Sequence, residues 1–305
     1  MNKLRWINNK LLFLPPGRKE ASHESGGCEK RQIITLKDVL AESGGRIAGK
    51  IGTTELLALE YYYRRVSPSF PPALSWRRPA KRLWIDSGVF PVEKKQFYKF
   101  IECYLQSIQE INALHLWQRD PFLGPFEEAL AQKYCSHARL LERGELSYLS
   151  ISDLLPLRWL VISPFVDTMK QQIGKISQIH NLRADSSIIQ QTIQSCQFLQ
   201  CPQFSHLVPS PFQNWTEGLR KLTEDALAQK FDIAIIGAGA WSLPILAELK
   251  KAGKKGLHLG GETQLLFGIK GRRWDEKNLY NEHWVRPSSQ ETPSNFMKKE
   301  NGCYW

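Results

Sequence analysis

One stretch of the sequence combines a glycine turn with the start of a helix, and such turns can hold phosphate. Residues 232–261 read DIAIIGAGAWSLPILAELKKAGKKGLHLGG, so an apolar run meets a Gly-x-Gly turn at Gly237 and Gly239. A turn of this kind between a strand and a helix exposes backbone N–H groups at the positive end of the helix, where anions bind well. The sequence therefore predicts either a nucleotide-binding turn or a tightly packed turn that binds nothing.

The rest of the dinucleotide fingerprint is incomplete. That fingerprint needs a third glycine after the turn and an acid at the end of the second strand, where the acid binds ribose hydroxyls. Here Ser242 takes the place of the third glycine. The end of the second strand carries His258, Gly260 and Gly261 instead of an acid, and Glu262 follows about one turn after the expected position. The second glycine pair instead favours a crevice at the carboxyl edge of a parallel sheet, where ligands of open α/β sheets bind.

A second strand–turn–helix junction, GKIGTTELLAL, covers residues 49–59. Gly52 provides the turn, Thr53 and Thr54 are candidate helix caps, and Glu55 lies in the first helical turn. An acid at this position complements the helix dipole. Because Thr53 precedes Glu55 by only two residues, the spacing of a capping box fails. Glu55 is therefore a candidate to point into a cleft instead.

Polar and basic residues follow the second glycine pair. Thr263 and Gln264 come first, and the segment GIKGRR then places Lys270, Arg272 and Arg273 in a loop. The glycines of this loop indicate that another group approaches it closely. A ligand that carries phosphate or sugar fits the chemistry of these side chains.

Two single residues have both a structural and a functional interpretation. His258 either packs at the end of its strand or binds a sugar hydroxyl or phosphate. Asp167 follows a Pro-Phe turn and is either an acid of a first helical turn or a base for an acceptor hydroxyl. The sequence contains no P-loop, no HExxH pair, no G-x-S-x-G elbow and no RNA-binding aromatic signature, so none of those classes has a motif to support it.

Composition limits the partners of the chain. Its 305 residues include 41 Lys and Arg against 30 Asp and Glu, a net charge of +11, which favours anionic partners. The basic residues recur along the chain without a nucleic-acid-binding signature, so no specific nucleic-acid partner is expected. No run of 18 apolar residues occurs, which predicts no membrane-spanning helix. Six cysteines without a CxxC pair are typical of reduced thiols in a cytoplasmic protein. The sequence leaves the oligomeric state open, and a homo-oligomer is one of the alternatives.

The elements that must position these residues indicate an α/β protein. From residue 157 onward expected strands alternate with expected helices, which predicts a Rossmann-like, mostly parallel sheet flanked by helices, with helical insertions. Residues 66–82 hold four prolines and predict no regular element. Strands are expected at 46–52, 157–165, 187–194, 232–236 and 256–260, and helices at 53–65, 92–114, 126–134, 166–177, 215–230 and 242–252.

Three parts follow from this pattern. Residues 1–34 are expected to form a flexible N-terminal tail, and residues 35–270 the α/β domain. Residues 271–305 show little periodicity, but their tryptophans and tyrosines indicate a C-terminal arm that packs on the domain.

The early and late stretches together resemble the GT-D-type glycosyltransferases, which transfer a sugar from a nucleotide sugar. GKIGTTE is similar to the family's early R-[FY]-G-D-G-E stretch, with Lys50 in place of Arg and Thr54 in place of its second Gly. Gly52 and Glu55 match the first Gly and the Glu, whereas Thr53 replaces the Asp. In that family the Asp-x-Glu pair serves metal and sugar-nucleotide binding.

Later patches extend the resemblance over residues 45–265. LVISPFVDTMKQQI is similar to the family's central strand, Pro-Phe turn and helix. Gly237 and Gly260 match the glycines of its L-G-x-x-A turn and of its strand ending in I-G-H. The segment GGETQLLFGIKGRRW and the C-terminal Cys-Tyr-Trp resemble a divergent GT-D-like branch of the family.

The resemblance implies a glycosyltransferase that uses a nucleotide sugar and an unknown glycan or protein acceptor. Glu55 would then contact the donor sugar or a divalent cation, Mn or Mg, although the threonine hydroxyl of Thr53 is a weak ligand for such an ion. The basic loop with Lys270, Arg272 and Arg273 would neutralise the leaving diphosphate. The replacement at Thr53 also favours a rival, a non-catalytic protein of a polysaccharide pathway that binds sugar or nucleotide.

Overall fold

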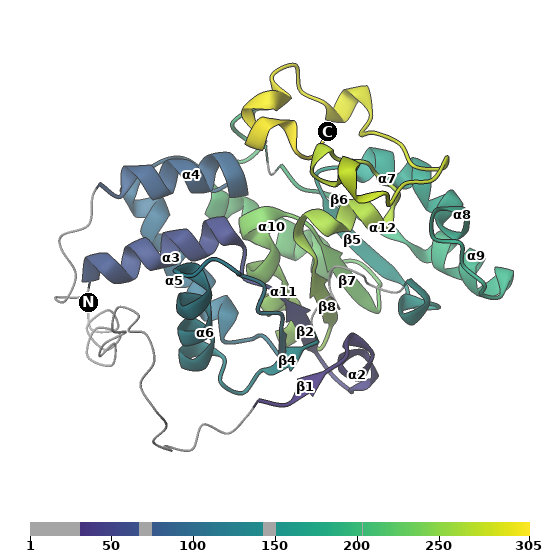
Figure 1. Ribbon diagram of the computed structural model, residues 1–305, viewed down its shortest axis with the longest axis horizontal. Helices are drawn as coiled ribbons and strands as arrows, with labels where there is room; N and C mark the ends of the chain where they lie inside the picture. Colours follow the sequence, from purple (N-terminus) through teal and green to yellow (C-terminus); the bar gives the residue numbers. More distant parts are fainter. Residues whose placement is uncertain (1–30, 67–74, 143–150, 203) are drawn as a thin grey trace.

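The protein folds around one parallel sheet. The computed structural model describes residues 31–66, 75–142, 151–202 and 204–305, and Figure 1 shows the sheet with helices on both faces. Most of the expected tail, residues 1–30, lies outside the described residues, whereas Ile33 and Ile34 form an edge strand of the sheet. The predicted α/β class is confirmed, and within the described ranges every strand pairing is parallel.

In the described part of the chain the sheet has eight strands, in the order β1-β4-β3-β2-β8-β7-β5-β6. The chain builds one half first, then crosses to the other half and returns to the centre with β7 and β8. The strands are β1 Ile33–Ile34, β2 Arg46–Gly49, β3 Ala113–Leu114, β4 Arg139–Leu141, β5 Trp159–Ser163, β6 Gln197–Gln200, β7 Ile233–Ile236 and β8 Lys255–His258.

Both faces of the central strands are buried, which explains their continuous apolar sequences. In β5, Leu160 and Ile162 face one core, whereas Trp159 and Val161 face the other. The first core holds α3 Thr53–Val66, α4 Arg77–Ser87, α5 Lys94–Ile108, α6 Leu123–Tyr134, α10 Trp215–Leu227 and α11 Ser242–Lys251. The second holds α2 Leu36–Ala41, α7 Val166–Gln172, α8 Ile176–His180, α9 Ser186–Ser195 and α12 Thr263–Leu266.

The strand predicted over residues 187–194 is wrong, because this segment forms α9. Asp185 caps the helix by accepting a hydrogen bond from the backbone N–H of Ser187 at 2.7 Å. Ile189 and Thr192, three residues apart, are the buried positions of the helix. A short segment with few apolar residues does not separate the two periodicities, and here the cap decides in favour of the helix.

The prediction of no regular element over 66–82 is wrong for its last residues, which begin α4. Pro79 is the third residue of this helix, a position whose N–H would have no partner within the helix, so a proline there costs no hydrogen bond. Gly88 ends α4 in the left-handed conformation at φ 83°. Residues 67–74 of the same stretch lie outside the described residues.

The C-terminal arm, residues 271–305, packs on the domain through α7. Glu291 of the arm accepts hydrogen bonds from the backbone N–H groups of Asp167 at 2.8 Å and Thr168 at 3.0 Å, so it caps this helix. The indole of Trp305, which is buried, donates to the backbone oxygen of Glu291 at 2.8 Å. The arm consists of short 3₁₀ turns at Arg272–Lys277, Ser289–Glu291, Phe296–Lys298 and Glu300–Gly302.

No helix in the described ranges combines the length and the apolar character that crossing a membrane requires.

Candidate functional site

A pocket of about 190 Å³ opens at the carboxyl edge of the sheet. Its walls include the segments that follow the neighbouring strands β3, β2, β8, β7 and β5, together with the end of α4 and the C-terminal arm. Ligands of open α/β sheets bind at this edge. The predicted site residues that line the pocket are Lys50, Gly52, Thr53, Glu55, Gly237, Gly239, His258, Gly260, Gly261, Thr263, Gln264 and Arg273.

One wall, which we call the glycine side, consists of Gly237, Gly239, Gly260 and Gly261. Gly239 and Gly260 adopt the left-handed conformation, at φ 55° and 62°. A Cβ atom on Gly237 would lie 2.5 Å from the backbone oxygen of Gly260 and from the hydroxyl oxygen of Thr263. The turns after β7 and β8 therefore touch, and Gly237 is needed for this packing whether or not it also contacts a ligand.

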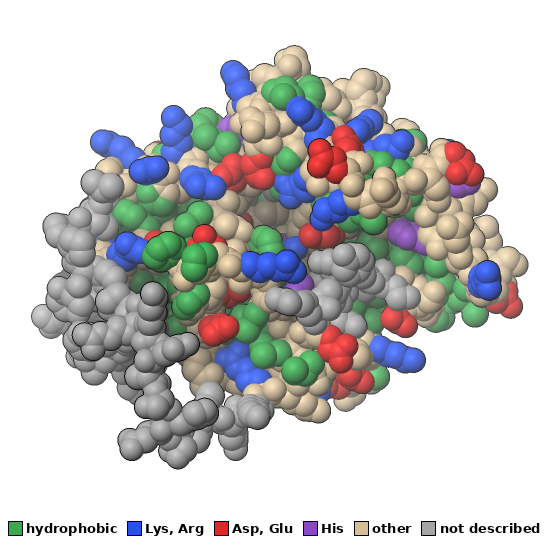
Figure 2. All heavy atoms as spheres, viewed as in Figure 1, with side chains coloured by type: hydrophobic (Ala, Val, Ile, Leu, Met, Phe, Trp, Pro, Cys, Tyr) green, Lys and Arg blue, Asp and Glu red, His purple; other side chains and the backbone are tan. Residues whose placement is uncertain are grey.

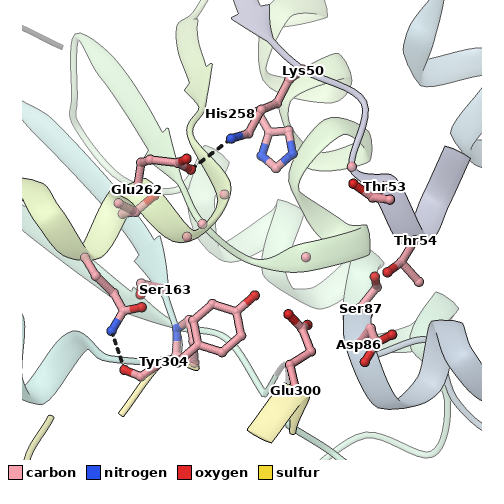
Figure 3. A pocket seen from close by; sticks show the side chains of 18 of the residues that line it. Lys50, Thr53, Thr54, Asp86, Ser87, Ser163, His258, Glu262, Glu300 and Tyr304 are labelled. Carbon is pink, nitrogen blue, oxygen red and sulfur yellow. Dashed lines mark hydrogen bonds and ion pairs between the residues drawn. The ribbon is translucent and has the colours of Figure 1, made fainter. Parts of the chain in front are cut away.

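Lys50, His258 and Glu262 lie together at one end of the pocket (Figure 3). The ammonium of Lys50 is 2.8 Å from Oε2 of Glu262 and 4.8 Å from the centroid of the Trp117 ring. Burial and the neighbouring Lys50 lower the pKa of His258 to about 4. His258 is therefore neutral near pH 7, so it can offer a hydrogen bond to a ligand but no positive charge to a phosphate.

Another part of the wall, which we call the carboxylate side, consists of Glu55, Asp86 and Glu300. Figure 3 shows Asp86 and Ser87 of α4 near Glu300 of the arm. Glu55 is 5% exposed, and burial raises its pKa although the Ser87 side chain hydrogen-bonds to it. A Cβ atom on Gly52 would lie 2.0 Å from Oε2 of Glu55, so the carboxyl group folds back over its own turn.

A fully buried lysine, Lys299, connects Asp86 and Glu300 of the carboxylate side. Its ammonium is 3.0 Å from Oε1 of Glu300 and 3.7 Å from Oδ1 of Asp86, and it also donates to the Asp86 backbone oxygen. Arg273 lies 3.0 Å from Oε2 of Glu300. Burial acts to raise the pKa of Glu300, but Lys299 and Arg273 outweigh it and lower that pKa. Glu300 is therefore ionised in this network.

Sequence reasoning missed Asp86, Ser87, Trp117, Glu300 and Tyr304, which all line the pocket. Asp86 and Ser87 end α4, and the sequence LWIDSG contains the signal that was overlooked, a glycine directly after a helical stretch. Glu300 and Tyr304 lie in an arm without periodicity, so no local pattern indicated them.

The structure does not bring Asp167, Lys270 and Arg272 to the pocket. Asp167 is exposed and lies 3.7 Å from Lys170. Lys270 lies over the ring of Tyr280, 5.5 Å from its centroid, and Arg272 donates to the Asn301 backbone oxygen at 3.0 Å. Arg272 and Arg273 leave their 3₁₀ turn in different directions, because consecutive side chains of such a turn point about 120° apart. Of the predicted basic loop only Arg273 lines the pocket. The prediction that all three cations of this loop contact a diphosphate is therefore wrong for Lys270 and Arg272.

The carboxyl groups of the pocket do not form the ligand set that Mn or Mg prefers. Within the described residues, no group of three or more His, Cys, Asp or Glu side chains is placed to hold a metal ion. Thr53, at the position of the first acid in the resembled motif, accepts a hydrogen bond from the Gln118 amide at 3.0 Å. Glu55 is therefore the single predicted metal ligand at this turn, and hard divalent cations need several oxygen ligands.

Two buried polar atoms of the pocket have no hydrogen-bond partner among the residues that the structure describes. They are the hydroxyl oxygen of Thr263 and the amide oxygen of Gln264, in residues 1% and 2% exposed. The Gln264 amide nitrogen donates to the Tyr304 backbone oxygen at 2.9 Å, which fixes the side chain. Buried polar groups rarely stay unpaired, so these atoms indicate a place for a polar ligand or for water.

Basic residues do not gather in one stripe on the face that Figure 2 shows. Lys and Arg side chains are dispersed there among acidic and apolar ones. Nucleic-acid-binding domains usually cluster such residues on one face or along one helix. The net charge of +11 therefore gives no reason to expect a nucleic-acid site on this face.

Comparison with known proteins gives no match: no family model, no curated protein and no solved structure corresponds to this chain. The function is therefore inferred from the chemistry of the pocket.

Proposed function

We propose that the chain is a glycosyltransferase that takes its sugar from a nucleotide sugar and passes it to a glycan or protein acceptor. One observation carries the proposal: the turns at Gly52, Gly237 and Gly260, far apart in the sequence, line the same pocket as Glu55. Two adjacent glycine turns next to a buried carboxyl group suit a ligand with a phosphate at one end and a sugar at the other.

In this proposal the glycine side holds the diphosphate. The turn after β7 leads into α11, a helix of ten residues whose N-terminal N–H groups favour an anion. Lys50 and Arg273 line the pocket and offer charged N–H donors, each of them also paired with a lining carboxylate, Glu262 or Glu300. Charge-assisted hydrogen bonds from such groups stabilise a leaving diphosphate without a metal ion.

The carboxylate side then faces the donor sugar. Glu55 is buried, and its raised pKa favours the protonated form, which can donate a hydrogen bond to a sugar hydroxyl. The ionised Glu300 can accept one. This division of roles requires no step through a divalent cation.

The test is a donor-hydrolysis assay with UDP-glucose, GDP-mannose and dTDP-glucose, in excess chelator and with added Mn²⁺. We expect turnover of at least one donor in chelator, and a loss of about 100-fold in kcat/KM for Glu55→Ala, which removes the hydrogen-bond donor. Glu60→Ala, on the same helix and outside the pocket lining, is the matched control and should keep the rate. Turnover that is lost in chelator and restored by Mn²⁺ would contradict the metal-free account.

The second candidate is a non-catalytic protein that binds sugar or nucleotide. It is favoured by Thr53, a neutral side chain at the position of the first acid in the resembled motif, whose hydroxyl already accepts a hydrogen bond from Gln118. Saturable binding of a nucleotide sugar without any turnover would support this candidate over the enzyme. For either candidate we propose a cytoplasmic location, in line with the free thiols of Cys103, Cys135, Cys196, Cys201 and Cys303.

A further inference from the structure

The strands and helix around the glycine side form one βαβ unit. An acid, Glu262, follows the second strand of this unit by more residues than the dinucleotide fingerprint expects. β7, α11 and β8 follow one another, and β7 and β8 pair in parallel with Ile236 opposite His258. In dinucleotide-binding units of this shape, an acid at the end of the second strand binds the ribose hydroxyls. Glu262 comes four residues after the end of β8, yet its side chain lines the pocket.

The carboxylate of Glu262 is held by one ion pair and can still accept further hydrogen bonds. Its Oε2 pairs with Lys50 at 2.8 Å, and its side chain is 24% exposed. Within the described residues, Oε1 takes part in no hydrogen bond or ion pair. A carboxylate fixed by one cation still has lone pairs that can accept hydrogen bonds from the two hydroxyls of a vicinal diol.

The pocket of about 190 Å³ opens beside this carboxylate. Gly260 has a φ of 62°, and a Cβ atom there would lie 3.5 Å from Cε of Lys50 and 3.9 Å from Oε2 of Glu262. Its absence leaves that position free. The next residues, Thr263 and Gln264, contribute the two buried polar atoms that lack a partner. The turn after β8 therefore presents an acceptor, an open position and unpaired polar groups together.

We propose that Glu262 binds the ribose 2′- and 3′-hydroxyls of the donor nucleotide, so that the pocket selects ribonucleotide donors over 2′-deoxyribonucleotide donors. This inference rests on the proposed function and narrows it to a class of donor. The phosphates at the turn after β7 and the ribose at Glu262 then occupy neighbouring turns at the carboxyl edge of one βαβ unit.

The experiment compares UDP with 2′-deoxy-UDP, which differ in one hydroxyl, by calorimetric titration of the full chain. We expect wild type to bind UDP about tenfold or more tightly, the ratio typical of one hydrogen bond to a charged group. Glu262→Gln should reduce this ratio to about threefold or less, because the neutral amide is a weaker acceptor. Glu248→Gln, the same change on the exposed face of α11, should keep the wild-type ratio.

A further variant separates the roles of the ion pair. Lys50→Met removes the ammonium but leaves the carboxylate. It should therefore weaken the binding of both UDP and 2′-deoxy-UDP and preserve the ratio of the two affinities. Equal affinity of wild type for both nucleotides, or an unchanged ratio in Glu262→Gln, would overturn the assignment of Glu262 while leaving the proposed function intact. If no nucleotide or nucleotide sugar binds wild type, both the assignment and the proposed function fail.

Discussion

The two sides of the pocket are built in different ways. The glycine side comes from one continuous βαβ unit, and its turns are held by direct backbone packing at Gly237. The carboxylate side joins α3, α4 and the C-terminal arm, whose residues Glu55, Asp86 and Glu300 lie far apart in the sequence. The buried Lys299 connects two of these three acids. One wall of the site thus depends on local chain geometry, and the other on long-range charge pairing.

The largest expected effect comes from breaking that charge pairing. Lys299→Met removes the buried cation that Asp86 and Glu300 share. Because both acids keep an arginine partner, the cost lies at the lower end of the range for a broken buried pair, about 3 kcal/mol. Urea denaturation should show this loss in the free energy of unfolding. Lys298→Met, at the exposed neighbouring position, should change it by less than about 0.5 kcal/mol. Equal effects of the two variants would show that the carboxylate side does not depend on Lys299.

A buried acid behind the carboxylate side should make stability depend on pH. Glu127 accepts a hydrogen bond from the backbone N–H of Gln118, whose side chain contacts Thr53, and burial raises the pKa of Glu127 from 4.5 to about 7. Between these values the unfolded chain releases the proton and the folded chain keeps it, so the stability contribution falls as pH rises. The total fall is on the order of 3 kcal/mol.

The measurement is a series of urea denaturations between pH 4 and pH 8 on wild type and Glu127→Gln. The variant cannot ionise at this position, so its curve should lack that fall. Glu128→Gln, the exposed neighbour on the same helix, is the control and should follow wild type. Parallel curves for wild type and Glu127→Gln would mean that Glu127 is ionised in the folded protein.

On the glycine side, Gly237→Ala should cost about 2 kcal/mol, the usual range for forcing an extra carbon into a packed site. The new methyl group would meet the Gly260 backbone oxygen and Thr263 at 2.5 Å, and the backbone cannot move aside without shifting β8. Denaturation gives the change in unfolding free energy. Gly174→Ala, where nothing lies within 4 Å, is the matched control. A tolerated Gly237→Ala would show that the two turns are not in fixed contact.

The smallest expected effect concerns the attachment of the arm away from the pocket. Glu291→Gln replaces one of the two oxygens that cap α7 by an amide nitrogen, which cannot accept the hydrogen bond, and loss of a cap costs about 1 kcal/mol. The free energy of unfolding should fall by that amount. Glu276→Gln, at an exposed position of the same arm, should leave it unchanged, and a larger loss there would contradict this role of Glu291.

The same contrast explains what the sequence predicted. Ile233–Ile236 and the turn at Gly237 form through neighbouring residues, so the strand, the turn and α11 follow from a local pattern. Asp86 and Glu300 enter the pocket only through the packing of α4 and the arm, which no local pattern encodes. Asp167 and Lys270 show the converse, because a suitable residue type near a predicted turn still points wherever its backbone directs it.

Calorimetric titration of the full chain with UDP-glucose, GDP-mannose and dTDP-glucose, with and without Mg²⁺ or Mn²⁺, tests the central claim most directly. We predict saturable binding of at least one of them, weakened about tenfold or more by Lys50→Met, which removes a cation from the pocket, and unchanged by Lys37→Met on the exposed surface of α2. Absence of binding by all three ligands, or equal affinities of the two variants, would contradict the account.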